Sequence, residues 1–141
     1  MKPKIIILEG ADGVGKSSLR FLISNYNGKY FILERFTPSI YAYGKLFKRE
    51  VDMNYVKRIE SALLEAFDVC AVFLHCSPEI LYKRYKRGKH VFKFTESDLV
   101  KLQEWMIEFI VEISKIDWLC IDNSFRSPQI TFELVKARYE L

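Results

Sequence analysis

The chain has 141 residues, a formal net charge of +4 and a hydrophobic content of 50%. This length fits one compact domain with a real core, and no apolar run approaches the roughly 18–20 residues that a membrane span needs. The modest positive charge suits a phosphate-rich ligand and does not require nucleic acid, which we do not expect as a partner. No secretory signal is visible, and Cys70 and Cys120 fall in expected buried strands. We therefore expect a cytoplasmic protein, without a membrane partner, whose cysteines are reduced core residues.

A glycine-rich segment follows the first apolar run, residues 5–8. It reads Gly10, four residues, then Gly15-Lys16-Ser17, which is the P-loop pattern between a strand and a helix. Glycines before a helix can be only a turn, but the strand before and the helix after favour a P-loop, whose backbone N–H groups surround phosphates. Lys16 is expected to reach the β- and γ-phosphates and Ser17 to hold Mg²⁺, so ATP and Mg²⁺ are the expected co-substrate and cofactor. The expected nucleotide contacts are Gly10, Asp12, Gly13, Val14, Gly15, Lys16, Ser17 and Ser18.

Short apolar runs and amphipathic stretches alternate along the rest of the chain. We expect strands at residues 5–8, 30–33, 70–74 and 118–121. We expect helices from residue 16, over about 38–48, 52–67, 77–87 and 95–114, and a closing helix that starts at Ser127-Pro128, with Ser77 and either Thr95 or Ser97 as N-caps. The alternation predicts an α/β fold of the P-loop NTPase type, with one parallel β-sheet of about four strands and helices on both faces. The whole chain, residues 1–141, is then one domain.

Two charges end the second of these runs. The run at residues 30–33 looks like a buried parallel strand, and Glu34 and Arg35 come directly after it. Charges at the carboxyl ends of parallel strands lie where open α/β sheets bind ligands. Glu34 can orient Mg²⁺-bound water or accept a proton from the group that is phosphorylated, and Arg35 can hold a phosphate as a bidentate fork.

Four stretches, taken in order, resemble thymidylate kinases and the related deoxynucleoside kinases. They are the P-loop, the segment from Glu34 to Gly44, residues 67–88 with Pro78-Glu79 and a basic helix, and the loop at residues 122–128. The resemblance implies a single nucleotide kinase-like domain with a basic lid at about residues 83–95. It also implies transfer of the γ-phosphoryl group of ATP to a (deoxy)nucleoside monophosphate, most closely dTMP. A homodimer is one expected assembly.

The resemblance assigns roles on the acceptor side. Arg35 would clamp the acceptor phosphate, Glu34 would serve as the catalytic carboxylate and a Mg²⁺ ligand, and Asp12 would bind the 3′-hydroxyl. Each has a simpler reading: Arg35 can pair with Glu34 or Glu60 at the surface, Glu34 can be a merely structural carboxylate, and Asp12 can cap its own loop.

The lid would supply positive charge to the transferred phosphoryl group. Arg84 and Arg87 lie three residues apart on one helix face and are the expected donors. Gly13 stands where one subclass of the family has a P-loop arginine, so the lid must provide that charge. The neighbouring lysines are expected to be solvated.

The sequence departs from the family where the acceptor base is read. The segment between the first helix and Glu34 is much shorter than in the family, and Gly44 stands where a base-reading glutamine is common. Tyr41 and Tyr43 can stack on a base or pack in the core, whereas His75 and His90 are read as structural.

Two alternatives stay open. The protein can be a deoxynucleoside kinase, or it can bind nucleotide or nucleic acid without catalysis and use the basic lid as a patch for phosphates. A GTPase is disfavoured because no Asn-Lys-x-Asp signature occurs.

Overall fold

Strands and helices alternate along the chain as the sequence predicts. The computed structural model describes residues 1–141. In chain order the elements are β1 (Lys4–Glu9), α1 (Lys16–Tyr26), β2 (Phe31–Glu34), α2 (Thr37–Leu46), α3 (Met53–Ala66), β3 (Asp68–His75), α4 (Pro78–Lys86), α5 (Glu96–Glu112), β4 (Trp118–Asp122) and α6 (Pro128–Tyr139).

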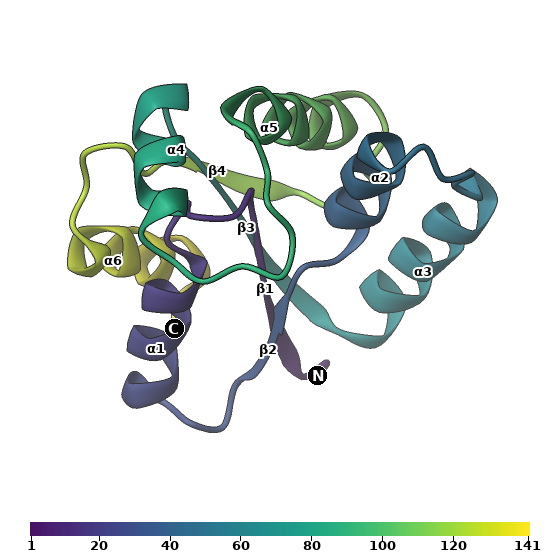
Figure 1. The fold of residues 1–141 in the computed structure, drawn as a ribbon. Coiled ribbons are helices and arrows are strands. Elements are labelled where there is room, and N and C mark those ends of the chain that lie inside the picture. Colours follow the sequence, from purple (N-terminus) through teal and green to yellow (C-terminus); the bar gives the residue numbers. More distant parts are fainter.

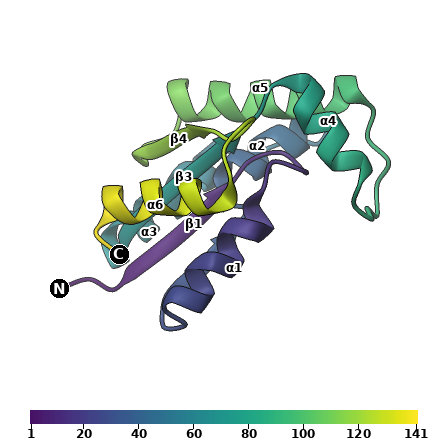
Figure 2. The same cartoon turned by 90° about the vertical axis from the view of Figure 1, so that its left-hand side faces the viewer.

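The four strands form one parallel sheet in the order β2-β1-β3-β4 (Figure 1). Helices α1 and α6 cover one face, while α2, α3 and α5 cover the other (Figure 2). The expected α/β fold with a four-stranded parallel sheet and helices on both faces is thus confirmed. Because all strands run the same way, the loops that follow β1, β2, β3 and β4 meet at one edge of the sheet.

The two central strands make the core. The residues of β1 from Ile5 onward and those of β3 from Cys70 to Leu74 are buried, because helices cover them on both sides. This explains why both strands read as continuous apolar runs in the sequence. No helix combines the length and the apolar character that crossing a bilayer requires.

The two outer strands are more exposed than the sequence indicated. β2 is an edge strand, so its first residue, Phe31, is 60% exposed and the strand is not the buried one that its apolar run indicated. β4 is the opposite edge strand, and Cys120 within it is exposed where a core residue was expected. Cys70, on the central strand β3, is buried as expected.

Side chains cap most of the helices that cover the sheet. Thr95 starts α5 with a capping box that it completes with Asp98, and Ser127 accepts a hydrogen bond from an N–H in the first turn of α6. Ser77 stands at the N-cap of α4, but its side chain makes no capping bond. Its N–H instead donates to Ser124 Oγ at 2.7 Å, so the loop after β4 fixes the start of α4.

Candidate functional site

A cleft of about 730 Å³ opens above the carboxyl ends of the strands. Its walls come from the loop after β1, the end of β2, the end of α4 and the loop between β4 and α6. The structure brings nearly all of the expected site residues to this cleft: Asp12, Gly13, Val14, Gly15, Lys16, Ser17, Ser18, Glu34, Arg35, Arg84 and Arg87. Gly10 alone lies outside the lining, buried at the start of the loop.

The loop after β1 needs glycine for two reasons. Gly10, Gly13 and Gly15 all have positive φ, at 144°, 89° and 107°. A Cβ on Gly13 would also lie 2.8 Å from the backbone nitrogen of Tyr85 in α4. Helix α4 therefore packs directly on the loop at residue 13, and no side chain fits there in this arrangement. The loop therefore has no room for an arginine at residue 13. A positive charge at this place in the cleft would have to come from α4 or from another lining residue.

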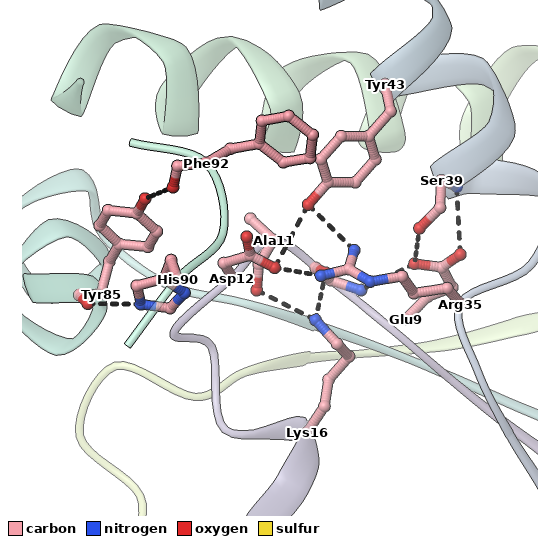
Figure 3. A network of polar contacts seen from close by, with 11 residues as sticks. Glu9, Ala11, Asp12, Lys16, Arg35, Ser39, Tyr43, Tyr85, His90 and Phe92 are labelled. Carbon is pink, nitrogen blue, oxygen red and sulfur yellow. Dashed lines mark hydrogen bonds and ion pairs between the residues drawn. The ribbon is translucent and has the colours of Figure 1, made fainter. Parts of the chain in front are cut away.

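The side chain of Lys16 is buried and folds back into the P-loop that precedes it. Its Nζ donates to the carbonyl oxygens of Gly10 and Ala11, at 2.5 and 3.2 Å (Figure 3). Burial and the nearby Arg35 lower the pKa of Lys16 to about 8, although Glu9 and other carboxylates partly oppose the shift. A phosphate entering the loop would give this ammonium an anionic partner in place of two neutral carbonyls.

Arg35 faces Lys16 from the end of β2. Its guanidinium forms an ion pair with Asp12 of the loop and donates to Tyr43 Oη at 3.0 Å, while Tyr43 Oη donates to Asp12 at 3.3 Å (Figure 3). Burial opposes the charge of Arg35, but Tyr43, Asp12 and Glu9 outweigh it and raise its pKa. The partner of Arg35 is therefore Asp12, and neither Glu34 nor Glu60 takes that place.

Arg35 also has an unusual backbone. Its φ is 76°, in the left-handed region that non-glycine residues rarely adopt. Strain of this kind is kept only where the surroundings enforce it, and it gathers at functional sites.

Two oxygen-bearing side chains in the cleft fit a nucleotide-bound Mg²⁺. Ser17 is exposed at the start of α1, and Glu34 lines the same cleft, with only a long ion pair to Arg20 at 3.6 Å. No group of three or more His, Cys, Asp or Glu side chains could hold a metal alone. Mg²⁺ usually keeps several waters and takes one or two protein oxygens together with substrate phosphates, so Ser17 and Glu34 are the two residues that could hold it here.

The two expected lid arginines differ. Arg84 donates to the carbonyls of Asn123 at 2.8 Å and Ser124 at 3.0 Å, and also contacts Cys76 Sγ at 3.3 Å. Arg84 therefore ties α4 to the loop after β4, within the lining of the cleft. Arg87, one turn later, is exposed and lines the cleft.

No protein-family model and no curated protein sequence matches the chain. Solved structures do match it. The YorR protein of Bacillus subtilis, in complex with phosphorylated GDP, has a TM-score of 0.77 and 22% identity, over 97% of this chain and 96% of that chain. Deoxyadenosine kinase from M. mycoides with bound dATP has a TM-score of 0.69 and 15% identity, over 97% of this chain and 100% of that chain. This chain has a P-loop kinase-like α/β fold. At these identities the likeness establishes the fold.

The expected lid of this kinase fold is organised around one tyrosine. Tyr85 Oη donates to the carbonyl of Phe92 at 2.6 Å and accepts the N–H of Phe94 at 2.9 Å. His90 stacks on the Tyr85 ring, with 3.9 Å between centroids, and its Nε2 lies 2.7 Å from the Tyr85 carbonyl. The segment after α4 thus folds back on α4. His90 has the structural contacts that we expected, but it also lines the cleft.

Helix α2, where the resemblance placed the acceptor, is tightly packed. Tyr41 is buried against Phe109 and its hydroxyl donates to Glu108 at 2.6 Å, so Tyr41 is a packing residue. A Cβ on Gly44 would lie 2.3 Å from Val51 Cγ2. Val51 therefore occupies the space into which a side chain at residue 44 would extend.

Sequence reasoning missed several residues of the site. Asn123 donates from Nδ2 to the Val14 carbonyl at 2.8 Å, which fixes the P-loop to the loop after β4. Arg126 adds a fifth cation to the cleft lining. The sequence offered one signal for both, because they lie in the loop at residues 122–128 that resembles the kinase family. Glu9, which is fully buried, carried no signal beyond its place before the P-loop.

Proposed function

We propose that the protein is an ATP-dependent phosphotransferase that transfers the γ-phosphoryl group to a (deoxy)nucleoside monophosphate, dTMP or a close analogue. The observation that carries this proposal is the placement of Lys16, at the start of α1, and Arg35, just after β2, in the lining of one cleft, with Asp12 beside both. A site that only binds ATP needs the first cation; a site that also positions a phosphorylated acceptor needs the second.

The proposed mechanism assigns one task to each part of the cleft. Backbone N–H groups of the P-loop and Lys16 hold the β- and γ-phosphates. Ser17 and Glu34 would hold a Mg²⁺ ion, which would supply neutralisation of the phosphate charge. Arg35 takes the acceptor phosphate in a bidentate contact, and Asp12 accepts a hydrogen bond from the 3′-hydroxyl. Arg87 places its charge over the cleft, where negative charge is shared among the phosphoryl oxygens during transfer.

A deoxynucleoside kinase is the second candidate. One observation favours it: the Arg35 guanidinium already has two partners, Asp12 and Tyr43, so no donor needs to be released if the acceptor carries no phosphate. The deoxyadenosine kinase with this fold is consistent with that reading. In this case Glu34 would accept the proton of the attacking hydroxyl.

An acceptor panel separates the candidates. ADP release with Mg²⁺-ATP is measured for dTMP, dUMP, dCMP, dGMP and dAMP and for the free nucleosides. We expect turnover of monophosphates, dTMP among them, with weak base discrimination because position 44 carries no side chain to read the base. Turnover confined to free nucleosides would support the second candidate. ATP binding without any turnover would contradict both and favour a nucleotide- or nucleic-acid-binding role.

A further inference from the structure

One buried carboxylate has no part in the proposed chemistry, although it contacts both sides of the cleft. Glu9, the last residue of β1, is 0% exposed. Its oxygens accept hydrogen bonds from Gly10 N (3.1 Å), Ser39 N (3.1 Å), Ser39 Oγ (2.8 Å) and Phe36 N. Four donors on two oxygens is a set that an ionised carboxylate accepts in full. Figure 3 shows Glu9 between Arg35 and Ser39.

Helix α2 begins without a cap of its own. Phe36 is the N-cap residue and has no polar side chain, and Pro38 in the first turn has no N–H. The first N–H groups of a helix need partners from outside the helix, and a negative charge there also interacts favourably with the helix dipole. Glu9 bonds to the N–H groups of Phe36 and Ser39. The missing cap of α2 is therefore supplied by strand β1.

This cap fixes the backbone on both sides of Arg35. The N–H of Arg35 donates to the Leu8 carbonyl at 3.0 Å, and the N–H of the next residue, Phe36, donates to Glu9. Two consecutive residues of β1 thus hold Arg35 in its left-handed conformation. This conformation directs the guanidinium across the cleft to Asp12.

The same cap also fixes the position of Tyr43, the second hydrogen-bond partner of Arg35. Tyr43 lies on α2, one helical turn after Ser39, and its hydroxyl contacts both Arg35 and Asp12. A shift of the first turn of α2 would move Tyr43 together with Arg35.

We propose that Glu9 is a positioning residue for the acceptor side of the cleft. By capping α2, it keeps Arg35 and Tyr43 in register with the P-loop, which begins at the next residue. The catalytic consequence rests on the proposed function; the positioning of Arg35 does not.

Glu60 provides a matched control. It is 1% exposed and accepts hydrogen bonds from Thr37 Oγ1 (2.7 Å), Ser114 Oγ (2.7 Å) and Lys115 N (2.8 Å). Like Glu9, it is a buried carboxylate that contacts the start of α2. None of its donors is an N–H group of α2, so its loss should cost stability without moving Arg35.

The kinetic test compares Glu9→Gln with Glu60→Gln in the full chain. Both should lower Tm, because each leaves buried donors facing an amide. Only Glu9→Gln should lower the acceptor kcat/KM, by about tenfold to a hundredfold, with the Kd for ATP changed by less than about threefold. Ser39→Ala, which removes one donor, should give a smaller loss in the same direction and replaces Glu9→Gln if that variant does not fold. An equal acceptor kcat/KM in the two glutamine variants, or an unchanged value in Ser39→Ala, overturns the inference.

A second readout needs no acceptor. In the wild type, the bonds to Asp12 and Tyr43 should slow rotation of the Arg35 guanidinium and give resolved Nη–Hη signals by NMR, assigned with Arg35→Lys. These signals should disappear in Glu9→Gln and persist in Glu60→Gln. If the signals behave in this way but the wild type turns over no acceptor, the positioning role of Glu9 stands and the proposed function is refuted. Unchanged Arg35 signals in Glu9→Gln overturn the inference, whatever the activity.

Discussion

The P-loop and the junction between β2 and α2 face each other across the cleft, yet they are built in opposite ways. The P-loop is a continuous segment, and its positive φ angles are borne by Gly10, Gly13 and Gly15. At the junction a positive φ is borne by Arg35, which is held there by residues from β1. A site made of consecutive residues carries its own conformational preferences, whereas the junction depends on contacts between separate elements. We therefore expect ATP binding at the P-loop to be little affected by substitutions at the junction between β2 and α2.

Arg35→Ala should give the largest difference between the effect on acceptor turnover and the effect on ATP binding. Loss of the guanidinium removes the proposed acceptor clamp but leaves the P-loop glycines and Lys16 in place. We expect acceptor kcat/KM to fall about a hundredfold while the Kd for ATP changes less than about threefold. Arg138→Ala, which removes an exposed arginine paired with Asp117 at 2.9 Å, is the control and should leave both constants unchanged. Equal losses of ATP affinity and acceptor turnover would show that the two sides are not separable.

The next largest effect concerns the lid. Arg87→Ala should lower kcat about tenfold with little change in Tm, because the exposed guanidinium acts on charge that develops during transfer. Arg84→Ala should lower kcat and also destabilise the protein by about 1–3 kcal/mol, because the carbonyls of Asn123 and Ser124 lose their donors. Steady-state kinetics and thermal melts check both. A rise in KM for ATP with kcat within about twofold would instead mean that the lid contributes uniform binding.

The pH dependence of ATP binding should report Lys16. The free protein holds this ammonium with a pKa of about 8, lowered by burial, and a bound phosphate favours the protonated form. ATP affinity should therefore fall as the pH rises, by about tenfold between pH 7 and pH 9. The stability of the free protein should change with the opposite sign. Between the folded pKa of about 8 and the usual value of 10.5 the unfolded chain binds more protons, so this group makes unfolding less favourable as the pH rises.

Lys16→Met provides the control for this titration. It should bind ATP weakly and lose the pH dependence over this range. If Lys16→Met retained the wild-type profile by calorimetry, another group would be responsible for the titration.

The smallest effect on turnover should come from Gly44. Gly44→Ala places a methyl group against Val51 and should destabilise the protein by about 1–3 kcal/mol in denaturant melts. Relative activity across the acceptor panel should not change, because the side chain would point toward Val51. A changed order of acceptors in a folded Gly44→Ala protein would place residue 44 at the base.

Much of the fold could be predicted because its signals are local. The apolar runs of β1 and β3, the P-loop, the cap at Thr95 and the helix start at Ser127-Pro128 each lie within a few residues of sequence. The exposure of Phe31 and Cys120 could not be predicted, because an apolar run does not reveal whether its strand lies at the centre or at the edge of the sheet.

The candidate site shows the same limit. The sequence predicted Lys16, Glu34 and Arg35 as site residues. It did not predict the partners of Arg35, because they come from distant positions in the chain. Arg84 shows why spacing is insufficient: it shares a helix face with Arg87, yet its guanidinium is bound by two carbonyls that lie about forty residues away. The capping of α2 by Glu9 spans 27 to 30 residues and has no sequence pattern.

Transfer of labelled phosphoryl groups tests the central claim most directly. The wild type and Lys16→Ala are incubated with Mg²⁺ and ATP labelled at the γ-phosphate, together with dTMP, and the nucleotide products are separated. The wild type should yield labelled dTDP, and Lys16→Ala should yield at least about a hundredfold less while keeping its fold and losing most of the ATP-induced rise in Tm. If the wild type bound ATP and labelled neither dTMP nor any other monophosphate, or if Lys16→Ala labelled dTMP as fast as the wild type, the proposed monophosphate kinase activity at this cleft would be contradicted.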